Sequence, residues 1–214
     1  MSKVKAKIKE MLRRNYTFAI RADESEDEGA IITGVPIVYD SPTDIGGMFE
    51  ETIESGALDN ADLTDVRFLV NHDTSKIPLA RSRKNNGSST MLLSVNEKGL
   101  SIRVKLDVEN NSEARNLYSA IKRGDITGMS FMFGVAENGE YWEDINGEYP
   151  KRHITAISTV VEVSAVTFPA YEATEINARA KEAVDTARAA VDTAKANSSV
   201  ELEKLKIEIL YGGK

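Results

Sequence analysis

Alternation of apolar and polar residues predicts a body made mostly of β-strands. Tyr16, Phe18 and Ile20 alternate with small or polar neighbours, which is the period of a half-buried strand. This strand is expected to form a hairpin with the next apolar segment, across an acidic turn. Further strands are predicted in the segments 30–39, 48–53, 66–70, 91–95, 100–106 and 126–135, and one long or two shorter strands in 152–166; residues 54–65 are expected to form loop and short helix.

Two parts of the chain have helical patterns. Residues 112–123 are amphipathic, with Ser112 as the expected N-cap and Gly124 as the C-terminal stop. Residues 176–196 are rich in alanine, contain no Gly or Pro, and repeat the heptad AVDTARA as AVDTAKA. We expect residues 197–199 to end this helix and a last short helix to follow.

The predicted elements give an α+β, mainly β fold in three parts. Residues 1–14 form a basic N-terminal arm, residues 15–171 the body and residues 172–214 an Ala-rich helical tail. The arm has six Lys or Arg residues against one Glu, and we expect it to be solvated. The heptads make self-association through the 176–210 tail possible, with a docking helix or a solvated helix as alternatives.

Composition and charge exclude several classes of function. The 214-residue chain has no cysteine and a formal net charge of −7, so disulfides, thiolate zinc sites and cysteine nucleophiles are excluded. The acidic body argues against a nucleic-acid partner, and no apolar run is long enough to predict a membrane span. Metal-ligand and phosphate-loop motifs are absent, so we expect neither a metal nor another cofactor.

Hydroxyl, imidazole and carboxylate chemistry remains. Only two histidines occur, and His72 comes just after the apolar run 66–70. At this position it is either a histidine of a surface turn, which position alone favours, or a catalytic base. Ser130 lies on the predicted strand 126–135, on the face opposite Met129 and Phe131, and is either a nucleophile or a packed serine.

A carboxylate in an apolar strand is the third candidate. Glu162 lies within the run Val160 to Val166, where a buried charge is costly unless it is paired with a partner such as an imidazolium. His153, the second histidine, follows charged residues at a strand start and is the rival partner. The residues alone leave both possibilities open.

Three motifs in order resemble one known family. They are Asn71-His72-Asp73, then the segment KRGDITGMSF ending at Phe131, then EVSAVTFPAY beginning at Glu162. Together with residues 34–43 and 49–57, they resemble the HK97-type caudoviral prohead proteases, which are similar to the herpesvirus assemblins. The resemblance covers about residues 15–172.

The resemblance implies a serine endopeptidase with an assemblin-like closed or partly open β-barrel. It implies cleavage of the scaffold segments of a major capsid or scaffolding protein, and of the protease itself, inside a phage procapsid in the host cytoplasm. Ser130 matches the nucleophile and His72 the general base. Glu162 is the choice for the third member, but assemblins use a second histidine there, which keeps His153 as the alternative.

Further site residues are expected near these three. Leu79-Ala80-Arg81 stands where the family more often has Leu-Gly-Arg, so Arg81 is a candidate for substrate binding, as are Met129 and Phe131 beside Ser130. Two other functions compete with the protease. A non-enzymatic capsid scaffold would not need these residues together, and a small-ester hydrolase is disfavoured by the absence of a GxSxG motif.

Overall fold

A computed structural model describes residues 11–16, 20–25, 29–167 and 173–211. The chain divides into two compact units. The first contains residues 1–42, 52–141 and 153–172, and the second contains residues 43–51, 142–152 and 173–214. The predicted body at residues 15–171 and the predicted tail at residues 172–214 stay predictions.

The element order is mainly β, as expected. The strands are β1 (Met11–Tyr16), β2 (Arg21–Ser25), β3 (Gly29–Val38), β4 (Thr43–Ile45), β5 (Phe49–Ile53), β6 (Val66–Val70), β7 (Ala80–Ser82), β8 (Met91–Asn96), β9 (Gly99–Lys105), β10 (Gly128–Val135), β11 (Glu140–Glu143), β12 (Lys151–Ile154) and β13 (Ile157–Val166). The helices are α1 (Ser112–Arg123) and α2 (Ala173–Tyr211).

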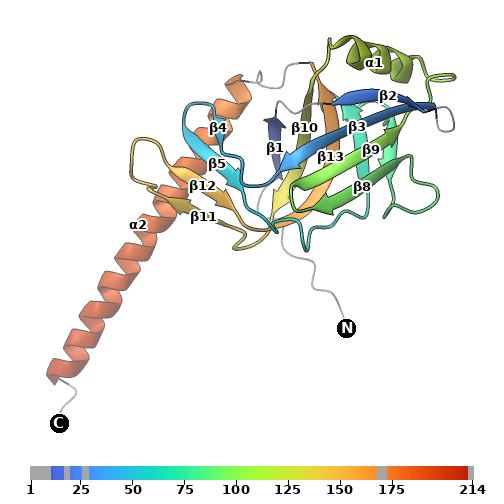
Figure 1. The fold of residues 1–214 in the computed structure, drawn as a ribbon. Helices are drawn as coiled ribbons and strands as arrows, with labels where there is room; N and C mark the ends of the chain where they lie inside the picture. The colour runs from blue at the N-terminus through green and yellow to red at the C-terminus, as the bar shows by residue number, and fades with distance from the viewer. Residues whose placement is uncertain (1–10, 17–19, 26–28, 168–172, 212–214) are drawn as a thin grey trace. The chain divides into compact units, whose positions relative to one another are not determined.

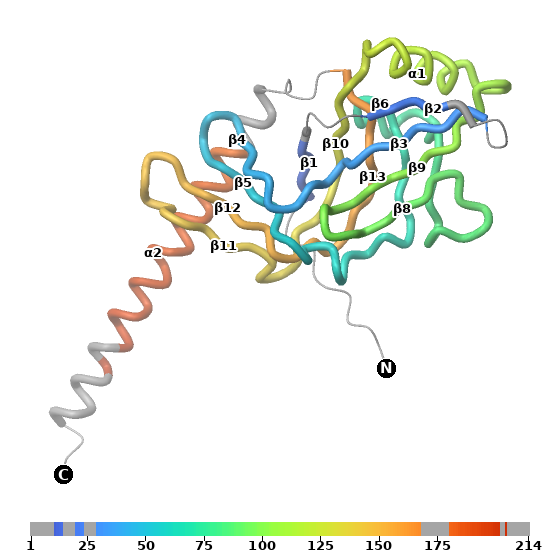
Figure 2. Tube along the Cα trace, viewed as in Figure 1, coloured from blue at the N-terminus to red at the C-terminus, as the bar shows by residue number. Residues whose placement is uncertain are grey.

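A five-stranded sheet in the order β1-β10-β13-β6-β7 is the main feature of the first unit (Figures 1 and 2). β10 pairs antiparallel with both β1 and β13, and β13 pairs parallel with β6. Side chains therefore alternate between the two faces along every strand. On β10, Met129, Phe131 and Phe133 point into the core, whereas Met132 is only half-buried.

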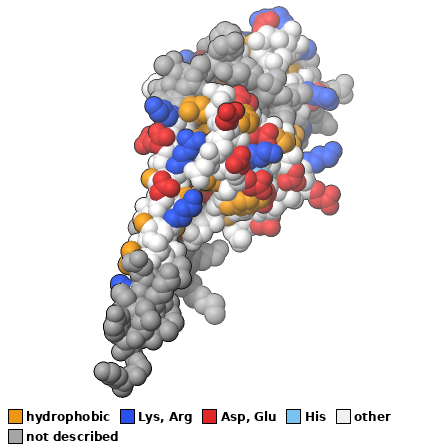
Figure 3. All heavy atoms as spheres, turned by 90° about the vertical axis from the view of Figure 1, so that its left-hand side faces the viewer, with side chains coloured by type: hydrophobic (Ala, Val, Ile, Leu, Met, Phe, Trp, Pro, Cys, Tyr) orange, Lys and Arg blue, Asp and Glu red, His pale blue; other side chains and the backbone are white. Residues whose placement is uncertain are grey.

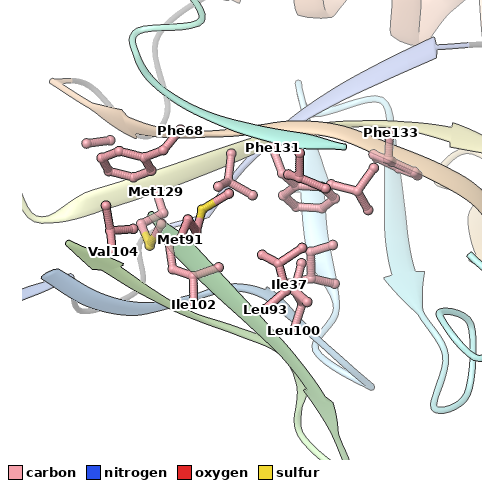
Figure 4. Close-up of a cluster of buried hydrophobic side chains, with 14 of the residues drawn as sticks. Ile37, Phe68, Met91, Leu93, Leu100, Ile102, Val104, Met129, Phe131 and Phe133 are labelled. Atoms are coloured by element: carbon pink, nitrogen blue, oxygen red, sulfur yellow. The ribbon is translucent and has the colours of Figure 1, made fainter. Parts of the chain in front are cut away.

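The core of this unit lies between that sheet and a four-stranded sheet in the order β2-β3-β9-β8. Figure 4 shows Met129, Phe131 and Phe133 on one side of the core. Facing them are apolar side chains of the second sheet: Ile37, Met91, Leu93, Leu100, Ile102 and Val104. Removing these side chains from water supplies the main driving force for the two-layer packing.

The second unit has a small core of its own, made by Ile45, Phe49 and Ile145 with Ala180 and Val184 of α2. The third sheet, in the order β11-β12-β5-β4, provides its strand residues. Figure 3 shows acidic and basic side chains interspersed with apolar ones on the visible face. No helix within the described ranges is long and apolar enough to cross a bilayer.

Several expectations are confirmed. The predicted hairpin of residues 91–95 and 100–106 forms, as β8–β9, and residues 152–166 contain two strands. The first predicted hairpin is shifted, because β3 pairs with Arg21–Ser25, part of which was predicted as the acidic turn. Helix α1 has the predicted bounds and ends at Gly124, whose φ of 80° suits glycine. Its N-cap is Asn111 rather than Ser112, because the Asn111 side chain accepts hydrogen bonds from the first free N–H groups.

Other expectations are wrong or not confirmed. The described strands form three sheets that do not close, because β1 and β7 end the largest sheet as edge strands, so the closed form of the expected barrel is wrong and its partly open form is not confirmed. Residues 11–14 are not a solvated arm but part of β1, anchored by Leu12 in the core. The predicted strand around Tyr16 to Ile20 falls partly on residues 17–19, which lie outside the described residues; β1 ends at Tyr16 and β2 begins at Arg21.

Two helix predictions also need correction. No helix forms in residues 54–65, where turns alternate with an isolated bridge. The tail helix does not break at residues 197–199, because α2 is continuous and the Ser199 hydroxyl donates to the Ala196 carbonyl of the same helix. Asn and Ser lower helix propensity only modestly, so they do not stop a helix that is already formed.

Candidate active site

Ser130, His72 and Glu162 form one continuous hydrogen-bonded chain. The Ser130 Oγ lies 2.6 Å from His72 Nε2, and His72 Nδ1 lies 2.5 Å from Glu162 Oε1. All three residues are buried, with Glu162 only 1% exposed. A buried carboxylate is costly without a partner, and here the imidazole provides one. The structure thus brings the three residues together from segments 58 and 90 positions apart in sequence.

The order of strands explains how these side chains meet. Ser130 pairs with Ser164 across β10 and β13, so Glu162, two residues before Ser164, projects from the same face of the sheet. β6 lies on the other side of β13 and ends at Val70, directly before the turn that carries His72. β13 therefore separates the serine strand from the histidine strand and places its carboxylate between them.

A strained turn aims the imidazole at this face. Asn71 and His72 both have left-handed backbone conformations, with φ of 51° and 57°. Asparagine tolerates this conformation better than other non-glycine residues, and its side chain forms two hydrogen bonds to Thr167 at the end of β13. The Asn71 N–H also donates to the Ala165 carbonyl. These bonds offset the cost of the unusual backbone.

Ser164 is a site residue that the sequence analysis did not single out. Its hydroxyl donates to Glu162 Oε2 over 2.5 Å and accepts the backbone N–H of His72 over 3.2 Å. The residue is fully buried. One hydroxyl thus contacts both the carboxylate and the histidine turn. The signal that could have indicated it is its spacing: Ser164 lies two residues after Glu162 on a predicted strand, so the two side chains point to the same face.

Ser130 has a further partner in β1. Its Oγ donates to the backbone carbonyl oxygen of Arg14 over 2.7 Å. β1 runs antiparallel to β10, with Asn15 paired to Ser130. The N-terminal strand therefore lies directly against the serine.

Two of the predicted substrate-binding residues are in the wrong place for that role. Met129 and Phe131 are fully buried and belong to the hydrophobic core. They point away from Ser130 because neighbouring residues of a strand alternate between its faces. Their contribution is to hold β10 in register through packing.

Arg81 pairs with Asp65 rather than with the three central residues. Its Nε and Nη2 lie 2.6 and 2.7 Å from the two carboxylate oxygens of Asp65, and this bond lowers the pKa of the Asp65 carboxyl below its ordinary value. In the strand register, Arg81 of β7 lies opposite Arg67 of β6, and Arg67 lies opposite Glu162 of β13. The three positions therefore form one row across the sheet. A role for Arg81 in substrate binding stays a prediction.

His153 lies apart from this chain of hydrogen bonds. Its ring stacks on Tyr141 at 4.5 Å, and its Nδ1 lies 3.2 Å from Glu54 Oε1. The residue beside His72 is therefore Glu162, as predicted from its burial in an apolar strand, and not the second histidine.

The arrangement provides a hydroxyl, a base that can accept its proton, and a carboxylate that can fix the orientation of that base. No group of three metal-ligating side chains occurs in the part of the chain that the structure describes.

Comparison with known proteins gives matches of two different kinds. The sequence model of a family described as caudovirus prohead serine protease matches residues 16–189. A solved structure, that of the bacteriophage T4 capsid assembly protease gp21, aligns with a TM-score of 0.42 and 13% identity, over 73% of this chain and 97% of that chain. No curated protein matches.

Proposed function

The chain belongs to the caudovirus prohead serine protease family and is a serine peptidase, and from this premise we propose that Ser130, His72 and Glu162 are its catalytic residues. The observation that carries the proposal is the buried chain of hydrogen bonds from the hydroxyl through the imidazole to the carboxylate. A hydroxyl is a weak nucleophile at neutral pH, so it requires a base within hydrogen-bond reach.

In the first half of the reaction, Ser130 Oγ attacks the carbonyl carbon of the scissile peptide bond. Its proton moves to His72 Nε2, which lies 2.6 Å away. The tetrahedral intermediate collapses when Nε2 returns this proton to the leaving amine, which gives an acyl-enzyme on Ser130. In the second half, water attacks the ester carbonyl and loses a proton to Nε2, and the serine leaves with that proton.

Glu162 acts through the imidazole. Its contact with Nδ1 keeps the proton on that nitrogen, so Nε2 is free to act as the base. The negative charge also stabilises the imidazolium that forms during attack. Ser164 acts as a positioning residue because it binds the second oxygen of the same carboxylate.

The substrate that we propose is a capsid or scaffold protein. Membership of a prohead protease family supports this class, and the T4 neighbour is named as a capsid assembly protease. The place of action is then the interior of the procapsid, where scaffold segments are cut. The alternative, a non-enzymatic scaffold protein, does not agree with the membership of this chain in a serine protease family.

Co-expression with the neighbouring capsid gene tests this proposal. The wild-type chain should convert the capsid protein to a shorter product, and Ser130→Ala should leave it at full length. Ser158→Ala is a matched control, because that hydroxyl also lies in the main sheet but donates to the Gly134 carbonyl. Intact-mass measurement reports both proteins. Unchanged processing with Ser130→Ala would assign the cut to another enzyme.

A further inference from the structure

The N-terminal strand β1 occupies the edge of β10 beside the proposed nucleophile. β10 has two edges, and β13 holds one of them. The second edge pairs with residues 11–16 along six consecutive positions, from Met11 opposite Gly134 to Tyr16 opposite Met129. An incoming peptide that adds to β10 as a further strand would need this same edge.

The contact at Ser130 places a second acceptor beside the proposed nucleophile. The hydroxyl has a single proton, and both the Arg14 carbonyl oxygen, at 2.7 Å, and His72 Nε2, at 2.6 Å, lie within reach of it. A carbonyl oxygen only accepts hydrogen bonds, so it competes with Nε2 for this proton. Departure of the Arg14 carbonyl leaves Nε2 as the acceptor of the two and favours the proton transfer that starts catalysis.

β1 is held in place by its side chains as well as by its backbone. Leu12 is 3% exposed and belongs to the main core, although the residue lies in a sequence rich in basic residues. Burial of this leucine favours the docked strand over the solvated one. Docking of β1, and with it access to β10, therefore depends in part on this one side chain.

From these contacts we propose that β1 is an intramolecular inhibitor, which competes with an extended substrate peptide for the edge of β10 and for Ser130. The inference rests on the proposed catalytic role of Ser130. The protease is then least active while residues 11–16 are docked, and it gains activity when they leave the sheet.

Labelling of the full chain with a fluorophosphonate probe, which reacts with activated serines, tests the competition. Leu12→Ala and Leu12→Asp should release β1 and raise the labelling rate about tenfold or more, because the reactive fraction rises. Leu117→Ala is the matched control, since Leu117 is equally buried but lies on α1. Thermal unfolding checks that each variant is folded. If Leu12→Asp does not fold, the labelling test uses Leu12→Ala alone.

A peptide of residues 9–18 provides the reverse test. Added in excess to the Leu12→Ala chain, it should restore slow labelling, whereas a scrambled peptide should not. Folded Leu12 variants labelled no faster than wild type would overturn the inference, as would cleavage of the peptide after Arg14, which would make it a substrate. Labelling that is unchanged by Ser130→Ala would instead refute the proposed function.

Discussion

Removal of the Ser164 hydroxyl should impair both catalysis and stability, by amounts that the contacts allow us to estimate. Ser164→Ala deletes the hydrogen bond to the Glu162 carboxylate and leaves the backbone N–H of the buried His72 turn without that acceptor. A hydrogen bond to a charged group is worth about 1.5–3 kcal/mol, and an unsatisfied buried donor costs about 1–3 kcal/mol. We therefore expect a loss of about 3 kcal/mol in the free energy of unfolding.

The catalytic loss follows from the same hydrogen bond. If the carboxylate loses its fixed position in the transition state, 1.5–3 kcal/mol corresponds to a fall of about 10- to 150-fold in rate. The rate of Ser130 labelling by the fluorophosphonate reports this directly, and denaturant unfolding reports stability.

Ser158→Ala is the control on the same strand. Its hydroxyl donates to a backbone carbonyl, so we expect a loss of only about 1 kcal/mol and unchanged labelling. A Ser164→Ala chain that is destabilised but labelled at the wild-type rate would refute the positioning role. It would leave Ser164 as a structural residue alone.

Three further predictions concern the site and the second unit. Glu162→Gln should lower the labelling rate by roughly 10³-fold or more, because the amide no longer fixes the imidazole tautomer, whereas His153→Ala should be close to wild type; the reverse result would overturn the assignment. Asn71→Gly should retain the left-handed turn but lose both hydrogen bonds to Thr167. Asn71→Ala loses the same bonds and also disfavours the left-handed backbone, so its free energy of unfolding should be about 1 kcal/mol lower than that of Asn71→Gly. Equal unfolding free energies for the two variants would contradict this account. Burial and then the hydrogen bond to Asp44 raise the pKa of Tyr149 to about 12, from an ordinary value of 10.0. Because the unfolded chain loses this proton first, the stabilisation is complete below pH 10 and disappears as the pH rises to about 12. Unfolding free energies measured from pH 9 to 12 should therefore fall less steeply for Tyr149→Phe, and identical slopes would count against this explanation.

The three central residues were predicted from the order of their motifs, which resembles one family, because the signal of each residue alone left an alternative open. Glu162 was visible as a charge in an apolar strand, and His72 as a polar residue at the end of another. Ser164 and Asn71 carried no comparable signal, since a serine in a strand and an asparagine before a turn are ordinary. Their role depends on which strands are neighbours, and local sequence does not specify this order.

The N-terminal strand was missed for a related reason. Met11-Leu12-Arg13-Arg14 does not alternate clearly, and its charge suggested a solvated segment. It becomes a strand because β10 offers an unpaired edge and the core accepts Leu12, so tertiary pairing decides its conformation. The sequence could not specify closure of the sheets, because strand count and period are the same in open and closed sheets, and the described sheets do not close.

β13 belongs to the core and to the site at the same time. Val163 and Ala165 are fully buried in the core, while the residues alternating with them, Glu162 and Ser164, belong to the proposed site. A slip of one residue in the pairing of β13 would exchange the two faces, moving the carboxylate into the core and valine toward His72. Correct core packing is thus a precondition for a complete set of catalytic groups, so a misregistered molecule would be inert as well as unstable.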